Sequence, residues 1–377
     1  MPRHHFLPDV VRVRPAGGRS PVRVDRRVAP EAWFELAYQD VSVIVQVNDG
    51  AEGDAGGGPD WPSSAASQPS VVARMLLDLD VHDRQRILEV GTGSGWNAAL
   101  LAHRVGADRV VTVEIDAALA ARARRRLAAL GPAAPKVVTA DGAAGGPTGE
   151  PYDRLLCTCA VERVPMSWLA RTRPGGRIVT PWATSWTAAG SAILTTRQDG
   201  SATGRFTPGG AFMRMRAHRA GRIDDLDTVV RPEHVPDLGR TAVSPWEVTG
   251  DADFAIGVAV PGAWHLWEPQ RPAESVHTRF WVADEAGTSW ACVDYDGTQL
   301  AHFAVRQFGP RRLWDEVSAA HAWWASVGRP GLDRFALTVD TDSTQSVRHD
   351  SPTGASWPVP GTAPEVHRFP KCSTNRE

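Results

Sequence analysis

Residues 86–97 read RILEVGTGSGWN and join a short apolar run to three closely spaced glycines. The run Arg86–Val90 predicts a buried strand, and the spacing of apolar residues over Asn97–Arg104 predicts a helix. Glycines at a strand–helix corner let the main chain turn tightly and approach a ligand, while the amides of the helix start face its negative group. We therefore expect a ligand-binding loop at Gly91, Thr92, Gly93, Ser94 and Gly95.

The alternation of strand and helix continues downstream of this loop. Apolar runs predict further buried strands at Arg109–Ile115, Lys136–Ala140, Arg154–Ala160 and Arg177–Pro181. A helix is predicted over Ala117–Leu130, because its leucines and alanines recur on one face. Strands that alternate with helices are typical of βαβ units. The predicted fold class is α/β, with a Rossmann-like, doubly wound and mostly parallel sheet.

Acidic side chains mark the ends of three of these predicted strands. Glu89 ends the first strand, Glu114 ends the second about 20 residues later, and Asp141-Gly142 ends the third. A carboxylate at the end of the second strand is where ribose hydroxyls would be bound. The aspartate can receive an adenine amino group. Three acidic strand ends in register are a stronger signal than the glycines alone.

The pattern E-x-G-x-G-x-G resembles the S-adenosylmethionine (SAM) site of class I methyltransferases rather than the dinucleotide motif. Further motifs follow in the order of the protein-L-isoaspartate O-methyltransferase family over roughly residues 30–185, and the chain is similar to that family. They are Ser67-Gln68-Pro69, LEVGTGSGWNAAL (88–100), Asp141-Gly142, PYD (151–153) and PGGR (174–177). The resemblance implies that SAM is bound by Glu89, Gly91, Thr92, Gly93, Ser94, Gly95, Asn97, Glu114, Ile115, Asp141 and Gly142, with no metal. It also implies that Ser67 lies beside the acceptor carboxylate; its alternative role is to cap the following helix.

Three departures from that family favour a more specific hypothesis. Some 150 residues follow the expected methyltransferase region, the loop Asp49–Ser64 is long, and Trp96-Asn97 replaces an aromatic residue and a glutamine. These features, with the segment FGPRR (308–312), resemble the actinobacterial branch that matures lanthipeptides and ATP-grasp ester-linked peptides. The predicted reaction is esterification of an aspartate in a ribosomally made peptide, leading through aspartimide to an imide or isoaspartate. The alternatives are general repair of isoaspartate in damaged proteins and a non-catalytic SAM-binding scaffold of a biosynthetic complex.

The composition changes along the chain and indicates more than one unit. We expect an N-terminal segment and acceptor-side loop at 1–66, the methyltransferase domain at 67–220, an α+β domain for peptide recognition at 221–350 and a flexible tail at 351–377. Nine of the 15 tryptophans lie in the last half. Strands are predicted there at Phe254–Val260, Phe280–Ala283, Trp290–Tyr295, Leu300–Gln307 and Phe335–Val339, and a helix after Pro310.

Charge and cysteine content limit the classes of partner. The formal net charge is −2, with 41 basic and 43 acidic residues, which argues against bulk electrostatic binding of nucleic acid or of an anionic membrane. Four cysteines are too few for a disulfide framework, and no secretory signal or membrane span is evident, so a cytoplasmic location is expected. Cys157 and Cys159 are interpreted as core residues. The expected partner is a peptide or protein that bears Asp or isoAsp, and the oligomeric state stays open.

Overall fold

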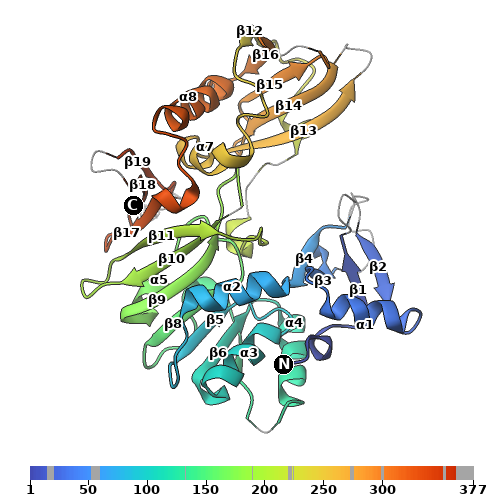
Figure 1. Ribbon diagram of the computed structural model, residues 1–377, viewed down its shortest axis with the longest axis vertical. Helices are drawn as coiled ribbons and strands as arrows, with labels where there is room; N and C mark the ends of the chain where they lie inside the picture. Colours follow the sequence, from blue (N-terminus) through green and yellow to red (C-terminus); the bar gives the residue numbers. More distant parts are fainter. Residues whose placement is uncertain are drawn as a thin grey trace, which may run out of the picture.

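Parallel strands form one half of the main sheet, as the apolar runs predict (Figure 1). In the computed structural model they are β5 (Ile87–Val90), β6 (Val110–Glu114), β7 (Lys136–Thr139), β8 (Tyr152–Cys157) and β9 (Thr172–Trp182). Their order is β7-β6-β5-β8-β9, and each neighbouring pair is parallel. The predicted α/β class is confirmed, and the carboxyl ends of β5, β6 and β8 meet at one edge.

Helices cover both faces of this part of the sheet. They are α2 (Pro69–Leu79), α3 (Trp96–Val105), α4 (Ala117–Ala128) and α5 (Met166–Arg171). Met75 and Leu79 of α2 share one core with Leu101 of α3, whereas Trp168 of α5 belongs to the core of the opposite face. Alternate residues of each strand supply both cores, since successive side chains of a strand point to opposite faces.

The same sheet continues as an antiparallel half that the sequence analysis did not foresee. It contains β10 (Gly190–Thr196), β11 (Ala202–Pro208), β17 (Phe335–Val339), β18 (Gln345–His349) and β19 (Ser356–Pro358). β17 pairs with β11, so the ten-stranded sheet runs β19-β18-β17-β11-β10-β9-β8-β5-β6-β7. β17 and β18 were expected in the C-terminal domain and β19 in the tail, but these three strands extend the main sheet.

A second, four-stranded sheet precedes the main one in sequence. Its order is β2-β1-β3-β4, with β1 (Val10–Val13), β2 (Val22–Asp25), β3 (Val43–Val47) and β4 (Pro62–Ala66), and α1 (Pro30–Tyr38) packs on it through Trp33 and Ala37. Short 3₁₀ turns lie at η1 (Arg3–Phe6) and η2 (Asn48–Gly50). The end of the expected loop 49–64 is therefore strand β4, whose register with β3 is irregular between Ile44 and Val47.

The C-terminal unit is a five-stranded antiparallel sheet of order β12-β16-β15-β14-β13. Its elements are β12 (Asp237–Thr241), β13 (Ala263–Arg271), β14 (Val276–Asp284), β15 (Trp290–Tyr295), β16 (Phe303–Phe308), α6 (Leu226–Val229), α7 (Asp253–Ala259) and α8 (Leu313–Ser326). The strand predicted at Phe254–Val260 is wrong, because this stretch forms the buried helix α7. A short run that is apolar all round fits a buried helix as well as a strand.

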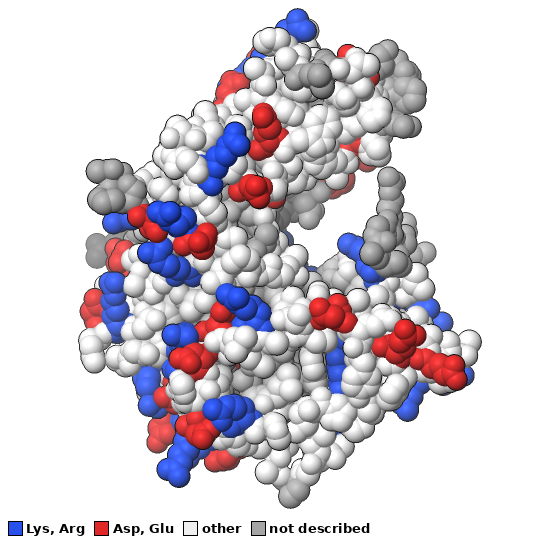
Figure 2. Space-filling model, viewed as in Figure 1, with Lys and Arg blue, Asp and Glu red and all other residues white. Residues whose placement is uncertain are grey.

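The structure describes residues 1–14, 21–51, 60–131, 133–188, 190–219, 223, 225–271, 276–298, 301–350 and 354–361. Residues 52–59, half of the loop expected at 49–64, and most of the tail at 351–377 lie outside these residues. Within the described ranges, none of the helices has the length and apolar content needed to cross a membrane. Figure 2 shows acidic and basic side chains interspersed on the viewed face, and a hollow between the C-terminal unit and the N-terminal sheet.

Candidate active site

A cleft opens at the carboxyl ends of β5, β6 and β8, where α/β sheets usually bind ligands. One wall, here named the cofactor wall, is the glycine loop 91–94 with the strand ends at Glu114 and Asp141. The facing wall, here named the acceptor wall, contains residues 63–67 and 212–216. The cleft encloses about 1110 Å³ of space, part of it open to solvent. A ligand of nucleoside size and a peptide side chain could therefore meet there.

Most of the predicted site residues line this cleft, and two do not. The lining includes Ser67, Gly91, Thr92, Gly93, Ser94, Asn97, Glu114, Ile115, Asp141 and Gly142. Glu89 lies behind the loop, and Gly95 faces α4, where an added Cβ would lie 3.4 Å from the Cβ of Ala123. The glycines of one loop thus serve two purposes, because Gly93 borders the cleft, whereas Gly95 adopts a φ of 89° at the N-cap of α3.

Glu114 lies at the centre of the cofactor wall. Its Oε2 accepts a hydrogen bond of 2.8 Å from the amide of Gly93, and its Oε1 accepts one of 3.1 Å from the amide of Asp116. Burial raises the pKa of Glu114 above its usual value despite these two donors. These two hydrogen bonds fix the carboxylate. Each oxygen can still accept a further hydrogen bond, for example from one of two neighbouring hydroxyls of a ligand.

Glu89 is fully buried and acts on the site through its neighbours. Its carboxylate accepts hydrogen bonds of 2.6 Å from Asn97 Nδ2 and from Thr112 Oγ1, and burial raises its pKa to about 7. Because Asn97 lines the cleft, the hydrogen bond that its Nδ2 donates to Glu89 fixes the orientation of that amide. Glu89 does lie near the end of a strand, β5, as predicted, but its buried side chain supports the loop from behind and does not line the cleft.

Ser67 lies on the acceptor-side wall, one residue before the helix cap. The N-cap position of α2 is Gln68, and Pro69 is its first residue, so the interpretation of Ser67 as a cap is wrong. Asp40 stabilises this helix start instead, because it accepts hydrogen bonds from the amide of Ser70 and from Gln68 Nε2. In the described part of the chain, the Ser67 hydroxyl makes no hydrogen bond to another residue, and it borders the cleft.

Sequence analysis missed the segment that forms much of the facing wall. Residues 212–216 read FMRMR, and the amide of Ala160 donates to the carbonyl of Met213 while Met215 donates back to Ala160. Phe212, Met213, Arg214, Met215 and Arg216 all line the cleft, as does Arg219. The alternation of apolar and basic residues could have drawn attention to this segment, but nothing local indicates what it faces.

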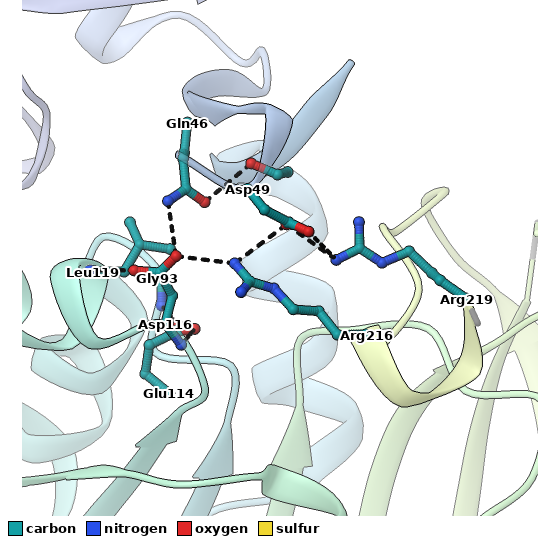
Figure 3. A network of polar contacts seen from close by, with 9 residues as sticks. Gln46, Asp49, Gly93, Glu114, Asp116, Leu119, Arg216 and Arg219 are labelled. Carbon is teal, nitrogen blue, oxygen red and sulfur yellow. Dashed lines mark hydrogen bonds and ion pairs between the residues drawn. The ribbon is translucent and has the colours of Figure 1, made fainter. Parts of the chain in front are cut away.

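An ion-pair network joins this segment to both the cofactor wall and the N-terminal sheet (Figure 3). Arg216 Nη2 lies 2.9 Å from Asp116 Oδ2 and 3.2 Å from Asp49 Oδ1. Gln46 Nε2 donates to the same Asp116 oxygen at 3.0 Å, and Arg219 pairs with Asp49 at 3.1 Å. Since Asp116 is two residues from Glu114, two distant segments, residues 46–49 and 216–219, fix the position of the proposed ribose-binding strand end.

The two cysteines at the end of β8 differ in their surroundings. Cys157 is buried, as expected of a core residue, but Cys159 lies past the strand and lines the cleft. The hydrogen bond with Cys157, together with burial, raises the pKa of Cys159 well above its usual value. The thiol therefore stays protonated and is a poor nucleophile.

Comparison with known proteins supports the sequence motifs. Residues 22–208 match the family profile described as protein-L-isoaspartate(D-aspartate) O-methyltransferase (PCMT). That segment belongs to the PCMT family. The protein-L-isoaspartate O-methyltransferase of Anaeromyxobacter dehalogenans is 48% identical over 116 residues, which are 30% of this chain and 54% of the relative. That of Ignicoccus hospitalis is 37% identical over 153 residues, covering 40% of this chain and 65% of the relative.

These matches span between half and two thirds of the length of the relatives. A solved structure called protein-L-isoaspartate O-methyltransferase aligns over 92% of this chain and 91% of its own, with a TM-score of 0.50 and 19% identity. At that identity the likeness concerns the fold, which is that of a class I SAM-dependent methyltransferase with an additional C-terminal β-rich region. These comparisons do not confirm the peptide-maturation branch, which stays a prediction.

Proposed function

We propose that this protein is a SAM-dependent carboxyl O-methyltransferase whose acceptor is the free carboxylate of an isoaspartyl residue in a peptide or protein. The observation that carries the proposal is the placement of Ser67 across one cleft from the glycine loop and Glu114. Most residues that line this cleft lie within the segment that matches the PCMT family, and residues 212–216 and 219 follow it. A non-catalytic scaffold would not need a serine hydroxyl at that place.

The cofactor wall offers SAM open space and carboxylate hydrogen-bond acceptors. A Cβ added to Gly93 would point across the cleft to Ser64, whose Oγ would lie 3.5 Å away, so a side chain there would fill ligand space. Glu114 would accept the ribose hydroxyls, Asp141 would face the adenine side, and the half-exposed Ile115 offers an apolar surface to the base. When bound, SAM supplies a methyl group activated by a sulfonium.

The acceptor wall needs no general base. A carboxylate with a reference pKa of about 4 is already ionised at neutral pH, and the described lining of the cleft contains no histidine or lysine. Ser67 would donate one hydrogen bond to an acceptor oxygen and direct the other oxygen at the methyl carbon. Orientation of this kind can supply of order 7–11 kcal/mol.

The methyl ester prepares a second, spontaneous step. A free carboxylate would have to expel an oxide ion, whereas the ester expels methoxide, which is a better leaving group. The nitrogen of the following peptide bond therefore attacks the ester carbonyl, and its proton leaves with the methoxide as methanol. The product is a five-membered succinimide, which water opens to aspartate or isoaspartate. Repetition of the cycle would convert isoaspartate to aspartate.

A second candidate is the same esterification of a normal aspartate in a ribosomally made peptide. The feature that favours it is the C-terminal unit, which stands over the hollow seen in Figure 2 and could select a shaped peptide. Isoaspartate methylation is supported better, because the matched relatives bear that name and a solved structure of that name shares the extended fold.

Replacement of Ser67 by alanine tests the acceptor wall. We expect Ser67→Ala to bind SAM normally and to lose roughly 10- to 100-fold in single-turnover rate on an isoaspartyl peptide, the equivalent of one hydrogen bond to a charged group. Leu77→Ala is the control on the same helix, because Leu77 is 75% exposed and does not line the cleft. A wild-type rate for Ser67→Ala would show that the serine takes no part in the transfer.

A further inference from the structure

Arg3 is a buried cation bound almost entirely by the main chain. Its side chain is 2% exposed. Nη1 donates to the carbonyls of Ala37 and Gln39 at 3.4 and 3.3 Å, and Nη2 donates to those of Val41, Ala66 and Ser67 at 2.8, 2.9 and 3.0 Å. Burial lowers its pKa to about 10, so the guanidinium is still charged at neutral pH.

Two of these bonds hold the peptide units on either side of Ser67, the serine of the acceptor wall. Arg3 fixes the carbonyls of Ala66 and Ser67, while Asp40 holds the side chain of Gln68 and the amide of Ser70. The hydroxyl of Ser67 has no partner of its own among the described residues, so its position follows from the main chain. Arg3 therefore controls the place from which that hydroxyl reaches the cleft.

The same N-terminal segment also touches the cofactor wall. The guanidinium of Arg3 lies 5.4 Å from the centre of the Trp96 ring, and Trp96 Nε1 donates to the carbonyl of Met1 at 3.2 Å. Trp96 is the first residue of α3, directly after the glycine loop, and lines the cleft. One side chain thus contacts both walls between which the methyl group must pass.

We propose that Arg3 is a positioning residue for the methyl transfer, which fixes the main chain of Ser67 relative to the glycine loop. The inference rests on the proposed function for its kinetic consequence. Its structural basis is the set of carbonyl bonds, which an apolar side chain would leave unpaired and a lysine could not span from one nitrogen.

A double-mutant cycle separates positioning from general stability. Single-turnover methylation of an isoaspartyl peptide is measured for wild type, Arg3→Met, Ser67→Ala and the double variant, well below their melting temperatures. We expect Arg3→Met to slow wild type by roughly 10- to 100-fold, the effect of a misplacement of about 1 Å. In the Ser67→Ala background we expect a further loss of no more than about twofold, because coupled residues are not additive. Equal losses in both backgrounds would overturn the proposal.

A second measurement does not depend on activity. Hydrogen exchange of a peptide covering residues 64–72 should be faster in Arg3→Met than in wild type, and intermediate in Arg3→Lys, which serves if Arg3→Met does not fold. Arg26→Met is the control, since Arg26 lies over the Trp33 ring in the same unit without contacting residues 66–67. If wild type methylates nothing but the exchange differs, only the proposed function fails. Unchanged exchange would contradict the role of Arg3 itself.

Discussion

Glu114→Ala should reduce the affinity for SAM by about 10²- to 10⁴-fold, because it removes the acceptor of two ribose hydroxyls at roughly 1.5–3 kcal/mol for each hydrogen bond to a charged group. The carboxylate is 7% exposed and is oriented by the amides of Gly93 and Asp116. The side chain is therefore already ordered before SAM binds, and its ordering reduces the binding free energy very little.

Titration calorimetry of SAM with the purified variant measures this effect. Glu114→Gln is the matched comparison, because the amide keeps the size of the side chain and one acceptor oxygen but loses the charge, and it should fall between wild type and alanine. Asp108→Ala provides a control, since Asp108 is an exposed acidic residue immediately before the same strand. Unchanged affinity in Glu114→Ala would contradict the assignment of the ribose site.

Removal of the chain after residue 220 should prevent cooperative folding. The rings of Phe206, Phe254 and Phe335 are packed in series at 4.7 and 5.0 Å between centroids, and Phe206 and Phe335 are fully buried. Truncation would remove two of these rings and expose the edge of β11. Phe335→Ala in the full chain should cost about 3–5 kcal/mol, a large part of a typical stability of about 5–15 kcal/mol.

Urea unfolding followed by circular dichroism checks this expectation. Leu238→Ala is the control, because Leu238 is 81% exposed and its loss should change the free energy of unfolding very little. A fragment of residues 1–220 that unfolds cooperatively and binds SAM like the full chain would show that the C-terminal strands are dispensable.

The sequence predicts the parallel half of the sheet well because each element has a local signal. Four of the five predicted runs from Arg86 to Pro181 contain most of a strand, and the fifth contains five of the 11 residues of β9. The acidic strand ends Glu114 and Asp141 meet at one edge because the strands are parallel. In parallel strands, residues at the carboxyl ends of successive strands lie at the same edge of the sheet, so their place can be predicted from the sequence. Glu89 shows the limit, since its strand end is correct but its side chain turns into the core.

Other features have no local signal. Thr203 of β11 pairs with Thr338 of β17, more than a hundred residues later in the sequence. Nothing in the sequence of either strand indicates which strand it pairs with. Arg216 and Arg219 reach the cleft from a segment outside the recognised motifs. The five carbonyls that surround Arg3 belong to the main chain, so composition cannot reveal them.

Methylation of a matched peptide pair tests the central claim most directly. Two peptides of one sequence, one with an isoaspartyl and one with a normal aspartyl linkage, are incubated with the full chain and SAM, and mass spectrometry follows ester formation and the loss of methanol. We predict that the isoaspartyl peptide gains one methyl group and passes to the succinimide, whereas the aspartyl peptide is unchanged. Methylation of the aspartyl peptide alone, or of neither peptide by a protein that binds SAM, would contradict the proposed function.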